Sequence, residues 1–575
     1  MAIYGLLIVL VVPLCLTVIY HFLLLRRSSF SQEGMADVIF KNATFYTGDP
    51  RRPWVDAIAV QKGRILELGA LDVVEKKIGP HTCYEDLNGG FIVPGFVESH
   101  AHVISGGLQM LQVNFQDVST QNEFIEKVKI AAREKQSGQW LLGGGWNNER
   151  WGGELPRASW IDVYTQDIPV WIYRMDGHMG LANSKALQIL GIIGNISDPE
   201  GGKLVRSKDG GLTGILIDSA MKLVADYIPE PTIKERRDAL VRASKLALSN
   251  GITTVVDFGR FFPGSPTTDV WDDFHNVYKW MDKKGSLPLR FSIFFPLETW
   301  SDVYTQIRLT GQRLSQNLKI GGLKAFADGS LGSGTAFFNE PYADDPSNYG
   351  LEILNTESVM NDVLQADKMG LQIAIHAIGD GANDRILALY QSINKSNGQR
   401  DRRLRIEHAQ HLSQNALDIF SSEQIIASMQ PEHLLDDANF ASKKLGEERA
   451  SRISYLFKSL LMKNVTLAFG SDWPVAHLNP LKGIIAATER RPPGSSLPWI
   501  PSECIEVHDA LRGYTLAAAY AAFLENEIGS LTQGKFADFA VLSEDIFHAH
   551  AEVSVLATYK GGIKVFSKET TDFVL

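Results

Sequence analysis

Two histidines separated by one residue follow an apolar segment in the N-terminal part of the chain. His100-Ala101-His102 stands directly after the segment 91–99. On a β-strand, residues i and i+2 point to the same face, so both imidazoles can bind one cation. Two surface histidines would have the same spacing, and a single His-x-His is a weak signal. The apolar strand before the pair favours a metal site, provided that further ligands are available.

Three more short apolar strands end in a side chain that can bind a metal ion. Their last residues are His376, His408 and Asp472. Any one of them alone is more commonly a hydrogen-bonded core histidine or a helix N-cap aspartate. In a parallel barrel, however, all strands deliver their C-terminal ends to one mouth. We therefore expect these three side chains to meet His100 and His102 around a divalent cation.

Lys324 lies inside another apolar strand, 320–328. An isolated buried ammonium group is costly, so this lysine must lose its charge, pair with an acid or be modified. Carbamylation by CO₂ would turn it into a carboxylate that bridges two cations. The alternative is a lysine that pairs with Asp328 or is exposed beyond the strand. Both interpretations stay open at this point.

The elements that position these residues alternate between strand and helix. Helical stretches are expected after the capping box Thr232/Glu235, up to Gly251, and over 356–369, up to Gly370. Eight strands alternating with helices predict an α/β fold, a TIM-like (β/α)8 barrel. An open doubly wound sheet is the alternative, but the first strand lacks a Gly-rich phosphate fingerprint. The expected strands are Phe91–His102, Thr253–Phe258, Leu289–Phe295, Ile320–Asp328, Leu371–His376, Leu404–His408, Ile425–Gln430 and Thr466–Asp472.

The chain divides into a barrel and a smaller β unit. About 150 residues separate the first two barrel strands, and a connection of that length needs structure of its own. We therefore place an inserted cap subdomain at about 104–250 within a barrel of residues 91–524. Residues 36–90 and 525–575 both have short strands and turns, which predicts one composite β-sandwich domain built from both ends of the chain.

The first 25 residues carry no charged side chain and are almost entirely apolar from Ile3 onward. About 20 such residues span a bilayer, so residues 1–27 are predicted to be a membrane anchor. A cleaved signal peptide is the alternative. The expected location is the endoplasmic reticulum or another endomembrane. Arg26 and Arg27 favour a cytosolic body, whereas four Asn-x-Ser/Thr sequons allow a lumenal one, so the side of the membrane is open.

Composition excludes several classes of protein. The 56 Lys and Arg against 66 Asp and Glu give a net charge of −10, without the basic footprint of a nucleic-acid binder. Cys15, Cys83 and Cys504 are too far apart for a disulfide framework or a CxxC metal site. Any metal ion must therefore be held by His, Asp, Glu or Lys side chains.

Nine motifs together resemble the amidohydrolase superfamily, in particular its amidohydrolase-3 branch. The resemblance covers about residues 37–565, and Glu98 stands where relatives often have Asp. It implies a metal-dependent hydrolase with a barrel and a composite β domain. It also implies that His100, His102, His376, His408 and Asp472 are ligands of one or two divalent ions, with zinc expected, and that Lys324 is a candidate bridge. The motifs are PGFVESHAH (94–102), Gly145-Trp146, the stretch 173–178, LKAFADGSLGSGTA (323–336), IHAIGDGAND (375–384), RIEHAQHL (405–412), MQPEH (429–433), GSDWPV (470–475) and GSLTQGKFAD (529–538).

The resemblance implies hydrolysis of carbon–nitrogen bonds in small, non-peptide amides by a metal-activated water. Asp472 is expected to take the proton of the attacking water and to return it to the leaving nitrogen. Glu407 is expected to point outward from its strand, with a structural role. Candidate substrate contacts lie in the cap and at the end of the seventh strand: Trp146, Arg174, His178, Gln430 and His433.

Two alternatives stay open. One is a catalytically silent, membrane-tethered binding or signalling protein on the same fold, for example in light signalling, because fold does not imply function. The other is an ester, lactone or deaminating hydrolase. The expected partners are a small amide-type substrate and the membrane, with no nucleic acid, and a homodimer is left open.

Overall fold

A computed structural model describes residues 34–192, 196–354, 356–548, 552–570 and 573. The predicted membrane anchor, residues 1–27, lies outside the described residues. Within the described ranges, no helix is both long enough and apolar enough to cross a membrane.

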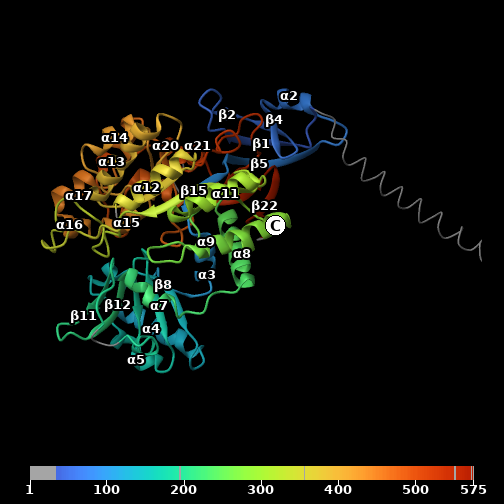
Figure 1. The fold of residues 1–575 in the computed structure, drawn as a ribbon. Coiled ribbons are helices and arrows are strands. Elements are labelled where there is room, and N and C mark those ends of the chain that lie inside the picture. The colour runs from blue at the N-terminus through green and yellow to red at the C-terminus, as the bar shows by residue number, and fades with distance from the viewer. Residues whose placement is uncertain (1–33, 193–195, 355, 549–551, 571–572, 574–575) are drawn as a thin grey trace, which may run out of the picture.

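Eight parallel strands form a nearly closed barrel in the middle of the chain (Figure 1). Their order in the sheet is their order in the sequence, and a bridge between Ala101 and Trp473 connects the last strand to the first. The predicted barrel is thus confirmed. The strands are β6 (Phe96–Ala101), β13 (Ile252–Asp257), β14 (Arg290–Pro296), β15 (Leu318–Phe326), β16 (Ile373–Ala377), β17 (Arg405–His408), β18 (Ile426–Met429) and β19 (Leu467–Phe469).

The prediction of one continuous first strand over 91–102 is wrong. The chain changes sheets at Gly95, between β5 (Cys83–Pro94) and β6. The Gly95 N–H donates to the carbonyl of Asp538 at 2.8 Å. A Cβ at this position would lie 2.6 Å from Thr253 Oγ1, so only glycine fits the junction. Both halves are apolar because both are buried, which is why the sequence pattern does not mark the break.

Strands from both ends of the chain form a second sheet, as expected. In Figure 1 the red C-terminal strands lie in one sheet with the blue N-terminal strands, and β20 of the C-terminal end pairs with β5. Hydrogen bonds join all of its strands into one mixed sheet instead of the predicted sandwich, in the order β22-β21-β20-β5-β1-β3-β4, with β2 paired to β1. The remaining strands are β1 (Val38–Tyr46), β2 (Trp54–Val55), β3 (Ala57–Gln61), β4 (Arg64–Gly69), β20 (Phe539–Leu542), β21 (Val555–Lys560) and β22 (Ile563–Ser567).

The part of the chain from β7 to α7, between β6 and β13, forms a separate six-stranded sheet with short helices, which we call the cap. Figure 1 shows the cap in teal, on the other side of the barrel from the terminal sheet. The predicted domain boundaries themselves stay predictions. The cap strands are β7 (Val113–Asn114), β8 (Leu141–Trp146), β9 (Val170–Arg174), β10 (Met179–Ala182), β11 (Gly202–Arg206) and β12 (Leu212–Asp218), and its helices include α4 (Gln121–Arg133), α5 (Ala158–Thr165), α6 (Ser184–Ile189) and α7 (Lys222–Ala225).

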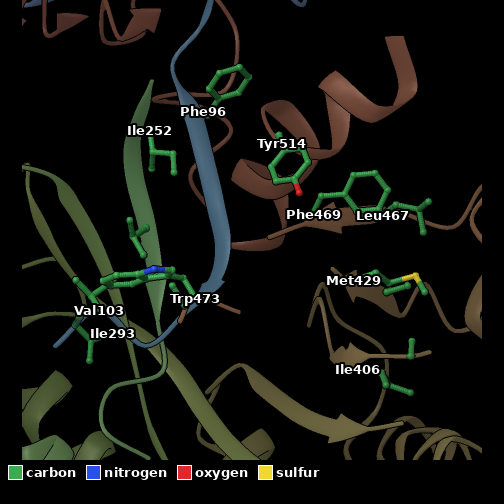
Figure 2. Packing of buried hydrophobic residues seen from close by; sticks show 14 of the residues in the cluster. Phe96, Val103, Ile252, Ile293, Ile406, Met429, Leu467, Phe469, Trp473 and Tyr514 are labelled. Carbon is green, nitrogen blue, oxygen red and sulfur yellow. The ribbon is translucent and has the colours of Figure 1, made fainter. Parts of the chain in front are cut away.

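Helices on the outside of the barrel hold its strands in place. The predicted capping box of Thr232 and Glu235 begins α8 (Ile233–Ser249). Figure 2 shows Phe96, Ile252 and Phe469, from three different strands, in the largest buried apolar cluster. The helix that directly follows the two histidines is α3 (Val103–Gln109); those of the later barrel units include α9 (Thr268–Asp273), α11 (Trp300–Thr310), α12 (Thr356–Lys368), α13 (Asp380–Asn397), α14 (Ala416–Ser422) and α19 (Pro480–Glu489).

Candidate metal centre

His100 and His102 lie at the C-terminal end of β6, with their Nε2 atoms directed at the same carboxylate oxygen. Each Nε2 is 3.4 Å from Oδ1 of Asp472. Nδ1 of His102 is 2.7 Å from the carbonyl oxygen of Gly259, so His102 must donate its Nδ1 proton there. Nδ1 of His100 is 2.6 Å from Glu407 Oε2. The two imidazoles are therefore held by their Nδ1 atoms, and their Nε2 atoms face the barrel mouth.

The loop after β19 brings Asp472 to this pair. Asp472 has a left-handed φ of 56°, and its N–H donates to the carbonyl of His100 at 2.8 Å. Burial alone would raise the pKa of Asp472, but the imidazoles of His100, His102 and His408 hold it well below its usual range. Asp472 is therefore an ionised carboxylate at neutral pH.

The residues fit a divalent cation. Nε2 of His100 and Oδ1 of Asp472 are both buried and have no hydrogen-bond partner among the residues that the structure describes. Burial, followed by the positive charge of Lys324, lowers the pKa of His100 to about 4, so the imidazole is neutral and its Nε2 carries a lone pair. Two electron-rich atoms that face each other in a buried space need a cation between them. His100, His102 and Asp472 are close enough together to bind one ion.

Glu407 supports His100 from inside the barrel, which corrects the expectation that it points outward. Its carboxylate is fully buried, and Arg405 donates to it from Nε at 2.7 Å and from Nη2 at 3.0 Å. The error arose at His408, whose φ of 75° breaks the strand alternation, so Glu407 and His408 both reach the interior. Arg405 and Glu407 have the i, i+2 spacing of one strand face, and this signal could have indicated the pair.

Glu98, to which the sequence pattern assigned no role, connects the two loops that carry the ligands. Its Oε1 accepts hydrogen bonds from the N–H groups of His100 (3.1 Å) and Ser471 (2.8 Å), and its Oε2 is 3.0 Å from Ser471 Oγ. The side chain is fully buried, and burial raises its pKa to about 8. At neutral pH Glu98 is therefore protonated in the folded protein and holds His100 and Asp472 in register.

Glu98→Gln is expected to fold normally and to remove one source of pH dependence. Glu in an unfolded chain has a pKa of about 4.3. Between about pH 4.3 and about pH 8 the folded protein therefore binds a proton at Glu98 that the unfolded chain does not bind. Stability therefore falls as pH rises through this window, by up to about 1.4 kcal/mol per pH unit for this group. Urea unfolding near pH 5 and near pH 8 measures the free energy of unfolding of parent and variant. Between these two pH values the parent should lose more stability than the variant. A difference that is independent of pH would contradict the protonated state.

A second group of candidate ligands shares Asp472. His408, His433 and Asp472 are also close enough together to bind one ion. Nδ1 of His408 is 2.8 Å from Gln430 Oε1, so the predicted substrate contact Gln430, 1% exposed, instead fixes the ring of His408. His433 lies 3.2 Å from the carbonyl of Ser471 through Nε2. Burial also holds the pKa of His408 well below its ordinary value, as metal binding requires.

His376 lies next to these ligands but has protein partners of its own. Its ring centre is 4.4 Å from that of His408. Its Nε2 is 3.1 Å from the carbonyl of Gly329 and 3.5 Å from Asp328 Oδ1. Asp328 accepts hydrogen bonds from the N–H groups of residues 337, 378 and 379 and so fixes the loops after β15 and β16.

Lys324 is buried beside the centre, with 1% of its surface exposed. Its Nζ lies 4.6 Å from the centre of the Phe258 ring, and that ring stacks on His100 at 4.1 Å. The alternative of an exposed lysine is therefore wrong. Asp328, the predicted partner of Lys324, accepts hydrogen bonds from backbone N–H groups. Burial lowers the pKa of Lys324 to about 8, although the carboxylates of Glu407 and Asp472 act against this.

The predicted substrate contacts in the cap divide into three cases. Trp146 is fully buried in an apolar cluster of the cap and donates to the carbonyl of Ile172. Arg174 reaches the centre, but its donors are taken by Asp176, Asn147 and Asn148. His178 faces His376, with ring centres 5.5 Å apart, and its Nδ1 is 2.7 Å from Asp218 Oδ1.

A cavity opens over these groups between barrel and cap, and we call it the metal cavity. Acidic and imidazole side chains dominate its polar lining, so a small polar group such as an amide finds both donors and acceptors there. Its lining residues include His178, His376, His408, His433, Asp437 and Asp472.

Known proteins share this architecture. The model of the amidohydrolase family matches residues 84–566. The chain is 51% identical to Protein LONG AFTER FAR-RED 3 of Arabidopsis thaliana, over 92% of each chain. It is 25% identical to N-substituted formamide deformylase of Arthrobacter pascens, over 92% of this chain and 98% of that one. An uncharacterised metal-dependent hydrolase of Pyrococcus horikoshii OT3 superimposes with a TM-score of 0.71 at 26% identity, over 89% of this chain and 98% of that one.

Proposed function

The chain belongs to the amidohydrolase family, and from this premise we propose that it is a metal-dependent hydrolase of small, non-peptide amides. The observation that carries the proposal is the buried pair of His100 Nε2 and Asp472 Oδ1 at the barrel mouth, with His102 beside them. Neither atom has a hydrogen-bond partner in the described ranges. The amide class is suggested by the name of the formamide deformylase.

Zinc fits this donor set of imidazole nitrogens and carboxylate oxygens. His100, His102 and Asp472 would hold one ion, and His408, His433 and Asp472 a second. When bound, zinc lowers the pKa of a coordinated water to about 7 and polarises a carbonyl group. A carbamate on Lys324 would supply a further oxygen ligand. A carbamate signal in the carbon NMR spectrum of protein loaded with ¹³C-bicarbonate, absent in Lys324→Met, tests that modification.

The protein's own side chains carry the proton transfers. Asp472 has two carboxylate oxygens, of which Oδ1 faces the histidine pair. Asp472 accepts the proton of the attacking water and passes it to the leaving nitrogen. His178 lines the metal cavity and is oriented by Asp218, so it donates a hydrogen bond to the oxygen on which negative charge develops. Glu407, Gly259 and Gln430 keep the ligand rings in place, since partners of this kind orient metal-bound imidazoles.

Metal analysis combined with a substrate panel tests this proposal. The purified full chain is expected to retain zinc and to hydrolyse at least one of a panel of N-formyl and N-acyl amines, with loss of activity on chelation and recovery on zinc addition. Esters and lactones in the same panel separate amide hydrolysis from the alternative hydrolase. Bound metal without turnover of any compound would instead support a silent binding protein, and absence of metal would refute the proposal.

A further inference from the structure

A second hollow lies between the cap and the barrel, and we call it the cap groove. Its walls come from α3, from the loop after β9, from α7 with the chain that follows it, and from the loop 259–266 after β13. Apolar side chains are spread along its length: Leu108, Met175, Met221, Ile228, Phe262 and Val475.

The cap groove adjoins the metal cavity. Arg174, Met175 and Val475 line both spaces. The ring of Phe262 stacks on His102 with 4.3 Å between ring centres and an angle of 28° between the planes. One aromatic ring therefore contacts both the groove and a candidate metal ligand, so a molecule can extend from one space into the other.

The charged side chains of the cap groove are paired within the protein. Lys222 contacts Asp226 at 2.6 Å. Arg260 contacts Glu230 at 3.0 Å and Asp269 at 3.3 Å. The remaining cation, Arg174, is paired with Asp176 at 2.6 Å. Each of the three lining cations therefore has an acidic partner, and each of the lining anions Asp226, Glu230 and Asp269 is paired with a cation. Within the described part of the chain, the groove offers no unpaired charge to a ligand.

Five prolines stiffen the groove walls. Proline has a fixed φ and no N–H group, so such a wall is apolar and loses little conformational freedom when a ligand binds. A rigid, apolar and charge-balanced surface favours an uncharged hydrocarbon group. The prolines are Pro229, Pro231, Pro263, Pro266 and Pro474.

We propose that the cap groove binds the larger, apolar substituent of a neutral amide whose carbonyl lies in the metal cavity. This rests on the proposed function and narrows its substrate class to amides with a long alkyl or aromatic group. Phe262 and Met175 are then specificity-determining residues, because they lie where the substituent leaves the metal cavity.

Alkyl hydroxamates of increasing length are suitable probes, because the hydroxamate group binds zinc and the chain extends from it. With zinc-loaded full-length protein, calorimetry is expected to show affinity rising by up to about fourfold per methylene from acetohydroxamate to octanohydroxamate. Ala225→Trp places a large ring in the groove from an exposed position on α7. This variant should lose most of the gain for the long probe and bind acetohydroxamate as the parent does.

Ala70→Trp is the matched control, because Ala70 is an exposed alanine beside the terminal sheet, and it should behave as the parent. Ile228→Asp is a second variant that puts a charge in the groove, and thermal melting of each variant verifies folding. Equal affinity for short and long probes, or an unchanged gain in both groove variants, would overturn the inference while leaving the proposed function intact. Failure to bind any hydroxamate would instead count against the metal hydrolase itself.

Discussion

Asp472→Asn is expected to reduce kcat/KM for an amide substrate by about 10²–10⁴-fold, the usual contribution of a general base. Asparagine keeps the shape of the side chain and one oxygen that can face His100 and His102, but it cannot accept the proton of the attacking water. Zinc content should therefore stay near that of the parent, while turnover is lost. Steady-state kinetics together with metal analysis measures the two quantities separately.

Asp418→Asn is the matched control for this experiment. Asp418 is an exposed carboxylate on α14 that pairs with the surface lysine Lys463, and surface ion pairs of this kind contribute little. The kcat/KM of Asp418→Asn should equal that of the parent. Turnover by Asp472→Asn at the parent's rate, with zinc bound, would remove Asp472 as the base.

Glu407→Gln is expected to lower zinc affinity by about 10–100-fold, the usual cost of losing a hydrogen-bond partner of a metal-bound histidine. It should also reduce the free energy of unfolding by about 3–5 kcal/mol, because Arg405 is left as an incompletely paired buried charge. Competition with a zinc chelator and urea unfolding measure the two effects.

The pKa of Glu407 determines the pH at which these measurements should be made. Burial would raise that pKa, but Arg405 and His100 outweigh it and hold it well below its usual range. The stabilisation is therefore complete above the unfolded pKa of about 4.3 and is lost only as pH falls further. Measurements at neutral pH record the full effect.

A control variant and a double variant show whether the losses of stability and of zinc affinity have separate causes. Glu448→Gln, at an exposed position on α17 (Glu447–Ile453), is the matched control and should change neither quantity. Arg405→Met combined with Glu407→Gln removes both buried charges, so it should regain stability without regaining zinc affinity. A double variant that binds zinc like the parent would show that Glu407 has no part in holding His100.

The sequence alone predicted the barrel and most of its candidate ligands, whereas His433, predicted as a substrate contact, became a candidate ligand only in the structure. Each apolar strand carries two local signals: its alternation, which predicts the strand, and a His, Lys or Asp in or directly after it, which predicts a ligand. Both are properties of a few neighbouring residues. Parallel strands then place His102, Lys324, His376, His408 and Asp472 at one mouth without further information. The break at Gly95 was missed because apolar residues continue across it into a different sheet.

Only the tertiary structure decided which side chains support the ligands. His100 and Glu407 are 307 positions apart, and Ser471 and Glu98 are 373 apart. Pairs this far apart give no signal in the sequence pattern, because the residues around each partner look like those of an ordinary strand or loop. The same holds for the cap groove, whose walls come from segments that are separate in sequence and meet only when the cap packs on the barrel. Buried hydrogen bonds and charge pairs are selected by this packing, since a polar group removed from water must find its partner wherever the fold provides one.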